Sequence, residues 1–349
     1  PGCEAQLQQE WTLINSLLEG WSRQHIDELE QSLHALKDIR AIIRKSSLAY
    51  VLEDVELFEV KRFLQAAAKI NQLLSELKWA PSRLIPPDIP ELYRTLAQGD
   101  SPGFYLAGSF APQLDEYREE QRRLKSALAH LRQEVQEDVS SKTGKGFNLQ
   151  GRLQISKLED ELIRELTHCP LLAFTAETYT EVEYRLRDTP EMTGLSQEIH
   201  ALEEKIQELE HRVRAELSQE VAAHRRRLLA ACRRLGRLDL ILAKAHLARG
   251  AAWCVPEIVP GSRLCLLDFV NPVVEQYLSK QGLSFQPFSL NLGDTLVTAI
   301  TGANMGGKSV SLKSAGLAVA MAQMGLLAPA KAFKFSLRSF IFYSQQEED

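Results

Sequence analysis

The sequence predicts a mainly helical protein that ends in the beginning of an α/β domain. Aromatic residues make up only 7% of the 349 residues, and Gly and Pro number 19 and 14, a usage that favours long helices over a β-sandwich. Apolar residues recur at spacings of three and four through most of residues 1–250. Near the C-terminus, a β-type apolar run, a glycine-rich turn and an apolar helix follow one another, which is typical of an α/β unit.

Residues 1–112 are predicted to form a helical core region. Apolar side chains spaced by three and four predict helices from the N-terminus to residue 77. Four prolines within residues 81–90 then break the helical pattern. Three glycines and two prolines predict a loop over residues 98–112, with a short strand at 104–106.

Residues 113–250 are predicted to form an antiparallel helical arm. A charged helix is expected over residues 113–140, followed by a turn at 141–146, and a second long helix over 195–248. Apolar residues of the second helix alternate in steps of three and four, as in a coiled-coil seam. The seam lasts barely two heptads, so we expect the two arm helices to pair with each other within one chain. The seam residues are Ile199, Leu202, Ile206, Leu209 and Val213.

A small β-element is predicted between the two arm helices, within residues 170–188. Over residues 180–187, Val182, Tyr184 and Leu186 alternate with charged residues. This is the period of a strand with one apolar face and one exposed face. The charged positions on the expected exposed face are Glu181, Glu183, Arg185 and Arg187.

Residues 251–349 are predicted to be the N-terminal part of the α/β domain. Apolar runs predict strands over residues 262–270 and 295–300. The apolar run 315–330 contains Gln323 and is shorter than a membrane-spanning helix. We therefore expect a buried helix there and no membrane partner.

The stretch GANMGGKS carries the clearest chemistry, because it matches the pattern G-x-x-x-x-G-K-[ST]. Its glycines allow backbone N–H groups to approach an anion closely, and the following helix adds the positive end of its dipole. The pattern places the ammonium of Lys308 near the β- and γ-phosphates of a nucleotide and makes Ser309 a Mg²⁺ ligand. A fortuitous glycine-rich turn is the alternative. The predicted phosphate-binding residues are Gly302, Ala303, Asn304, Met305, Gly306, Gly307, Lys308 and Ser309.

The string TGANMGGKSVSLK, followed by MAQMGLLAPA, resembles the ATPase core of the MutS family. That family's phosphate loop reads TGPNMGGKS, so Ala303 stands where the family has proline. The segment NPVVEQ resembles the family's R-H-P-V-V-E segment, with Val270 and Asn271 in place of Arg-His. Phe285-Gln-Pro resembles the family's F-x-x-N segment, whose phenylalanine stacks on adenine, although the asparagine is missing. The resemblance makes Phe285 a candidate adenine contact, with a core phenylalanine as the alternative.

The resemblance implies an ATPase with ATP and Mg²⁺ as cofactors, in which nucleotide state moves lever helices and an arm around DNA. It is strong over residues 270–345 and only architectural over 1–250. The family needs a later acidic strand and a signature loop, and it builds its paired sites across a homodimer. The sequence ends 40 residues after Ser309 without these parts. We therefore expect a truncated P-loop domain that does not hydrolyse ATP alone, and we assign no catalytic residue.

Candidate DNA contacts are basic residues of the arm. Arginines cluster within residues 222–237, a stretch without acidic residues, and such side chains commonly bind phosphates. Glutamates earlier on the same helix favour the plainer alternative of a solvated helix. The turn SKTGKG offers two lysines, for which a flexible hairpin tip is the alternative. The candidates are Arg225, Arg226, Arg227, Lys142 and Lys145.

Two functions from different classes remain open. The first is a MutS-like, DNA-associated ATPase of mismatch repair or recombination that binds double-stranded or branched DNA. The second is a MutS-related ATPase that remodels or reactivates a client protein, such as a cobalamin-dependent aminomutase; the net charge of -5 permits this alternative. A helical scaffold with a relic phosphate loop is a third.

The cysteines and histidines indicate the cellular compartment and whether a structural metal is expected. Five scattered cysteines and the lack of a signal-peptide pattern predict a cytoplasmic protein. No His or Cys pair has the spacing of a zinc site, so we expect no structural zinc.

Overall fold

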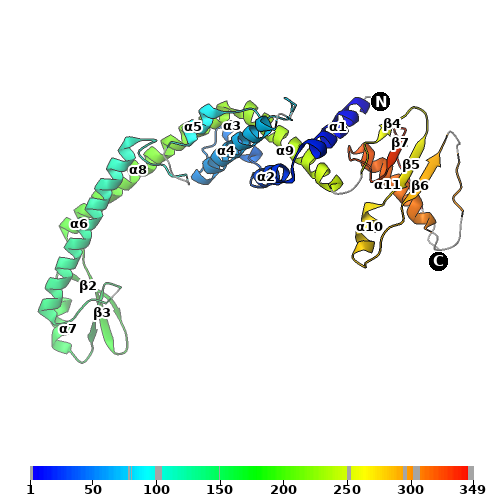
Figure 1. Cartoon of the computed structure of the whole chain (residues 1–349). Coiled ribbons are helices and arrows are strands. Elements are labelled where there is room, and N and C mark those ends of the chain that lie inside the picture. Colours follow the sequence, from blue (N-terminus) through cyan, green and yellow to red (C-terminus); the bar gives the residue numbers. More distant parts are fainter. Residues whose placement is uncertain are drawn as a thin grey trace. The chain divides into compact units, whose positions relative to one another are not determined.

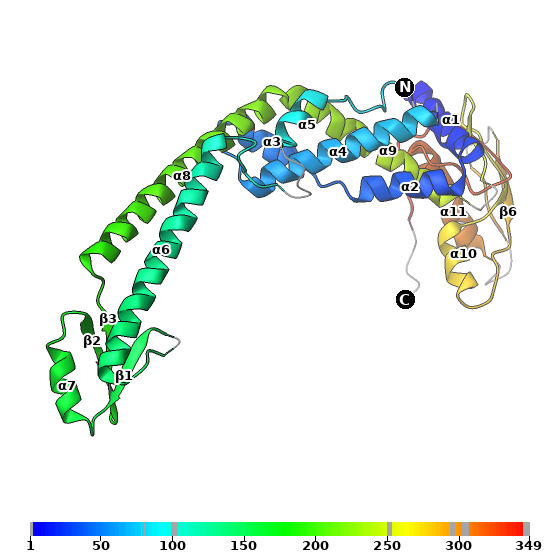
Figure 2. The ribbon, with the colours of Figure 1, turned by 60° about the vertical axis from the view of Figure 1, so that its left-hand side comes forward.

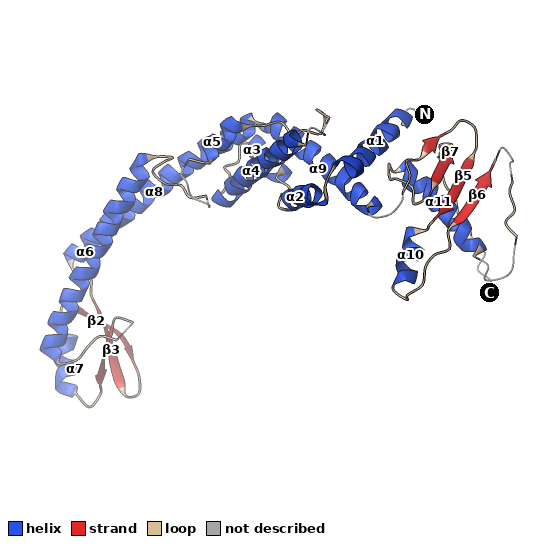
Figure 3. Cartoon of the chain, in the orientation of Figure 1, coloured by secondary structure: helices blue, strands red, loops and turns tan. Residues whose placement is uncertain are grey.

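The computed structural model describes residues 3–77, 79, 81–98, 104–148, 150–249, 253–293, 297–301 and 307–344 (Figure 1). The chain divides into two compact units. The arm unit comprises residues 41–61 and 90–225, and the core unit comprises residues 1–40, 62–89 and 226–349. The fold is mainly helical with small sheets, as the sequence predicts, and Figure 3 shows the strands in two separate groups. None of the described helices combines the length and the apolar character that crossing a membrane requires.

Two long helices, α6 (Pro112–Thr143) and α8 (Pro190–Ala223), lie side by side in the arm unit (Figures 1 and 2). Each begins with a proline, whose missing N–H costs nothing in the first turn of a helix. The Thr189 side chain caps α8 by accepting from the backbone N–H of Met192. Gly144 ends α6 in the left-handed conformation. The predicted pairing of the two arm helices is therefore confirmed.

The apolar seam of α8 is buried, but the predicted second arm helix is divided in two. Of the five predicted seam residues, Ile199, Ile206 and Val213 are buried, whereas Leu202 and Leu209 are half-buried. However, α8 ends at Ala223, and α9 (Arg225–Ala248) begins after a break at His224. Neither glycine nor proline marks this break, which lies next to the boundary between the two units.

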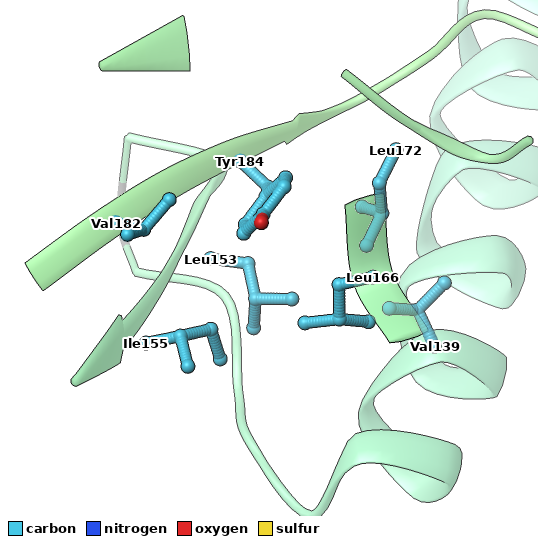
Figure 4. Packing of buried hydrophobic residues seen from close by; sticks show 7 residues of the cluster. All are labelled: Val139, Leu153, Ile155, Leu166, Leu172, Val182 and Tyr184. Carbon is cyan, nitrogen blue, oxygen red and sulfur yellow. The ribbon is translucent and has the colours of Figure 1, made fainter. Parts of the chain in front are cut away.

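A β-module completes the arm unit between α6 and α8. Its strands pair antiparallel in the order β1-β3-β2. Figure 4 shows how apolar side chains of the strands, of α7 and of Val139 on α6 converge in one small core. The predicted strand over residues 180–187 is the central strand of this sheet. The elements are β1 (Arg152–Ser156), α7 (Asp160–Thr167), β2 (Leu172–Glu177) and β3 (Glu181–Leu186).

Two local predictions in the arm unit are wrong. Glu183 was expected on an exposed face but is buried, because Arg152 and Gln154 of β1 donate to its carboxylate at 2.7 and 2.9 Å. Residues 104–106 form no strand. Instead the carbonyl of Leu106 accepts a hydrogen bond from the guanidinium of Arg118 at 2.6 Å. The remaining arm helices are α3 (Arg40–Ser47), α5 (Pro90–Leu96) and the first part of α4 (Asp54–Glu76).

The core unit packs α1 (Glu4–Gly20) and α2 (Arg23–His34) with α9 and the second part of α4. Trp11 of α1 is fully buried and meets Phe335 edge-on at 6.3 Å between ring centroids. Trp21 and Trp79 pack edge-to-face at 5.1 Å. These aromatic contacts join the N-terminal helices to distant parts of the chain.

A mixed sheet in the order β4-β7-β5-β6 forms the C-terminal part of the core unit. β5 runs antiparallel to both of its neighbours, whereas β4 and β7 are parallel. Its strands are β4 (Glu257–Ile258), β5 (Leu264–Phe269), β6 (Phe288–Leu292) and β7 (Ala332–Phe335), and its helices are α10 (Pro272–Ser279) and α11 (Lys308–Gln323).

The two strands predicted in this region have different outcomes. The strand over residues 262–270 is confirmed as β5. The strand over residues 295–300 is not found at residues 297–300, and residues 294–296 lie outside the described part. A strand needs a neighbour to pair with its backbone groups, and the described strands β4–β7 pair only with one another. Val297 is accordingly exposed.

Candidate functional site

The start of α11 carries the predicted phosphate site. Gly307 has a φ of 79° and a ψ of 7°, a left-handed conformation that glycine adopts at little cost. Lys308 follows as the first residue of the helix, and Ser309 is exposed in the same turn. The backbone therefore turns at a glycine directly into a helix N-terminus, the arrangement that favours an anion. Gly302, Ala303, Asn304, Met305 and Gly306 lie outside the described residues.

Small and apolar side chains hold α11 in the core unit. Its buried residues cover one face of the helix, so the predicted buried helix is confirmed over residues 315–323, whereas residues 324–330 of the apolar run lie beyond the end of α11. Gln323, the polar residue in the apolar run, exchanges two hydrogen bonds with the backbone of Arg338, at 3.0 and 2.6 Å. The buried residues are Ser314, Ala315, Ala318, Val319, Met321 and Ala322.

Asn271 connects α10 to α11. Its Oδ1 accepts from the backbone N–H groups of Val273 and Val274 at 3.1 and 3.2 Å, which caps α10. Its Nδ2 donates to the hydroxyl of Ser314, in the middle of α11, at 2.7 Å. Both Asn271 and Ser314 are buried, so this bond satisfies polar groups that water does not reach.

The segment of Phe285 contacts α10 through a backbone hydrogen bond. Its backbone N–H donates to the Oε2 of Glu275, in the first turn of α10, at 2.6 Å. α10 thus contacts the segment of Phe285 through Glu275 and α11 through Asn271. The structure connects the segments around residues 271 and 285 with each other and with α11, the helix that begins at Lys308. Phe285 as a whole residue is half-buried.

The candidate DNA contacts lie in two stretches of the chain, at the end of α6 and at the start of α9. Lys142 pairs with Asp138 at 2.6 Å on α6, and Lys145 pairs with Glu159 at 2.8 Å in the β-module. Arg225 ends the arm unit, whereas Arg226 and Arg227 begin the last segment of the core unit. All three of these arginines are exposed.

Two arginines of α9 support the proline-rich loop that precedes α5. Arg227 donates to the carbonyl of Asp88, and Arg234 donates to the carbonyl of Ile85 at 2.8 Å. These contacts give part of the arginine cluster a structural role.

A second set of arginines on α9 forms an exposed row, which we call the arginine row: Arg226, Arg233 and Arg237. Spacings of seven and four residues place them on one face of a helix, over about 16 Å at 1.5 Å per residue. Within the described residues, none of the three has a hydrogen bond or an ion pair. The helical period was the signal in the sequence that separates this row from Arg227 and Arg234.

No group of three or more His, Cys, Asp and Glu side chains among the described residues could hold a metal ion. Ser309, the Mg²⁺ ligand expected from the sequence, lies exposed in the first turn of α11, and its role stays a prediction.

Comparisons with known proteins point to one family. The model of MutS domain V matches residues 298–347. The DNA mismatch repair protein MutS of Acetivibrio thermocellus is 26% identical over 335 residues, which cover 90% of this chain and 37% of that protein. The MutS protein of Aquifex pyrophilus is 24% identical over 92% of this chain and 38% of its own length. The chain thus spans little more than a third of these relatives.

Proposed function

We propose that this chain, which belongs to the MutS family, binds ATP and Mg²⁺ at residues 302–309 and passes the nucleotide state to its long helices. The observation that carries this proposal is Gly307, whose left-handed backbone leads directly into α11 with Lys308 and Ser309 in the first turn. Backbone N–H groups at such a turn and the positive end of the helix are complementary to phosphate. The activity proposed is nucleotide binding, and no catalytic residue is assigned.

The network around α10 supports a nucleotide site beyond the phosphate loop. α10 joins the segment of Phe285 to α11 through Glu275 and Asn271. The family resemblance makes Phe285 a candidate adenine contact, and with that role one short helix would align the base contact with the phosphate contact. In a longer chain, two such sites would be completed across a homodimer.

Substitution of Lys308 tests nucleotide binding directly. Lys308→Ala removes the ammonium proposed to lie at the β- and γ-phosphates, so binding of a fluorescent ATP analogue with Mg²⁺ should weaken by at least about tenfold. Lys313→Ala is the matched control, because it removes a lysine from the next turns of the same helix, where Lys313 lies over the ring of Tyr343. Equal affinity of Lys308→Ala and the wild type would refute the site.

Double-stranded or branched DNA is the proposed partner, and the arginine row is the surface that favours it. Three exposed guanidinium groups along about 16 Å of helix can each approach a phosphate. Arg225 and Arg227 extend the positive charge at the start of α9. Lys142 and Lys145 contribute less, because each is already paired with a carboxylate.

A salt titration tests the DNA proposal. We expect the affinity for duplex DNA to fall linearly on a log–log plot against salt, and the triple variant R226A/R233A/R237A to reduce the slope by about 0.9 per lost contact. The double variant R122A/R123A is the control, since these exposed arginines of α6 are paired with glutamates. An unchanged slope in the triple variant would exclude the arginine row.

A client protein is the second candidate partner, and the charge of the β-module favours it. Residues 144–189 contain six Lys and Arg against eight Asp and Glu, a net charge of −2 that repels phosphate. Binding of neither homoduplex, mismatched nor branched DNA at low salt, together with intact ATP binding, would favour the client-remodelling function.

A further inference from the structure

The far end of α11 is held by an ion pair between the buried Lys244 and the half-buried Glu10. Lys244 of α9 donates from Nζ to Oε1 of Glu10 on α1 at 2.5 Å and to the backbone carbonyl of Met324 at 2.5 Å. Met324 is the C-cap of α11, so this carbonyl belongs to the group of acceptors that a helix end leaves unpaired. The side chains of Lys244 and Glu10 retain only 11% and 18% of their exposure.

The chain after α11 leaves no room beside this ion pair. Gly325 has a φ of 78°, and a Cβ atom there would lie 2.9 Å from both Nζ of Lys244 and Cδ of Glu10. Glycine is required both for the left-handed turn and for the close approach. The end of α11 is therefore fixed between α1 and α9 by packing as well as by charge.

We propose that Lys244 and Glu10 are positioning residues that fasten the far end of α11, so that a shift of the phosphate loop is passed to α1 and α9. The inference deepens the proposed function and rests on it, because it takes nucleotide as the source of the shift. It assigns a role to two residues that belong neither to the predicted phosphate-binding stretch 302–309 nor to the segment of Phe285.

A shift at one end of α11 would reach α1 and α9 for two physical reasons: the helix is stiff, and unpairing a buried charge costs free energy. α11 has 16 residues, about 24 Å at 1.5 Å per residue, and its hydrogen-bonded backbone moves as a rod. Phosphate at its N-terminus and an ammonium at its C-terminus both match the helix dipole. A displacement of α11 along its axis either carries Lys244 with it or leaves a buried ammonium without its partners, which is strongly unfavourable.

Amide hydrogen exchange with and without ATP and Mg²⁺ tests the inference, with affinity for a fluorescent ATP analogue measured in parallel. In the wild type, we expect nucleotide to change the exchange rates of α1 and α9 by at least about fivefold. In Lys244→Met the change should shrink to less than about twofold while nucleotide still binds. Lys244→Arg restores charge and donors and should restore the change, which a loss of packing alone would not predict.

Lys334→Met is the matched control, because Lys334 of β7 pairs with Glu257 at 2.7 Å on the surface of the same unit. It should behave as the wild type. Glu10→Gln keeps an acceptor for Lys244 and replaces Lys244→Met in this experiment if Lys244→Met does not fold. We expect Glu10→Gln to lose at least half of the nucleotide-dependent change in the exchange rates of α1 and α9.

The outcomes separate the two proposals. A wild type that fails to bind nucleotide overturns the proposed function and the inference with it. Nucleotide binding without any change in α1 and α9 overturns only the inference. A full change in Lys244→Met, or in Glu10→Gln where the former does not fold, also overturns the inference and leaves the nucleotide site standing.

Discussion

The guanidinium of Arg118 on α6 lies 2.7 Å from the carboxylate of Glu210 on α8, and this half-buried ion pair joins the two long helices of the arm unit. Arg214 also donates to Glu210, at 3.2 Å, and reaches Asp54 at the start of α4 at 2.7 Å. The Glu210 carboxylate thus connects two guanidinium groups, one on α6 and one on α8. The hydrogen bond to Asp54 raises the pKa of Arg214, so its charge is permanent.

Removal of the Glu210 carboxylate should destabilise the arm unit. Glu210→Ala leaves two partly buried guanidinium groups without their shared partner, and we expect a loss of about 1–3 kcal/mol in the free energy of unfolding. Urea denaturation followed by circular dichroism measures it. Glu208→Ala is the control, because Glu208 is exposed on the same helix and contacts Arg212 only at 3.5 Å. Equal effects of the two variants would contradict this role of Glu210.

Acid should destabilise the β-module through Glu183. Hydrogen bonds from Gln154 and Arg152 hold the pKa of the Glu183 carboxyl below its usual value. Because the folded pKa is the lower one, the stabilisation is present above the unfolded pKa, near 4.5, and is lost as the pH falls through the folded pKa.

Hydrogen exchange in β1 and β3 between pH 7 and pH 3 checks this direction, after correction for the intrinsic pH dependence of exchange. Glu183→Gln should be less stable than the wild type at neutral pH, and the difference should vanish on acidification. A difference that persists unchanged at low pH would rule out the carboxylate as its source.

The Oδ1 and the Nδ2 of Asn271 should contribute separately to stability and to nucleotide binding. Asn271→Ala removes the cap of α10 and the partner of Ser314, so we expect a loss of about 1–3 kcal/mol in stability and weaker ATP binding. Asn271→Asp keeps the cap acceptor but loses the donor to Ser314. Thermal melting and nucleotide titration of both variants resolve the two contributions.

Ser279→Ala is the control for Asn271, since Ser279 lies at the exposed C-terminal end of the same helix. If Asn271→Ala melted and bound nucleotide like Ser279→Ala, α10 would not be the connection between the segments of the site.

The thiol of Cys232 should resist alkylation. Burial raises its pKa to about 11, and the negative charge of Asp38 adds to the shift. At pH 7.5 the thiolate is a minute fraction, and its reaction with iodoacetamide should accelerate about tenfold per pH unit below that pKa. Cys3 is exposed and should be modified first. Mass spectrometry of peptides over a pH series distinguishes the two; rapid modification of folded Cys232 at pH 7.5 would contradict the prediction.

Periodicity and turn chemistry explain why much of the fold was predictable. The seam of α8, the strand β5 and the buried face of α11 depend on patterns that are local in the chain. The elements β1 and α7 lie outside the β-element predicted within residues 170–188, and β2 lies inside it without a predicted strand of its own. Each buries few side chains and shares one core with the others and with Val139. The arginine cluster was visible in the sequence. Only the structure shows that Arg227 and Arg234 bond to the loop around Ile85 and Asp88, whereas the arginine row does not.

The sequence by itself determined the helical class, the glycine-rich turn with Lys308 and Ser309, and the family, since these depend on residue types at short spacings. The tertiary structure decided that Glu183 is buried, that Asn271 bonds to Ser314, and that Lys244 meets Glu10 across 234 positions of the chain. Such contacts depend on which helices and strands become neighbours. A periodic pattern indicates that a face is buried, but it does not name the residue that covers it.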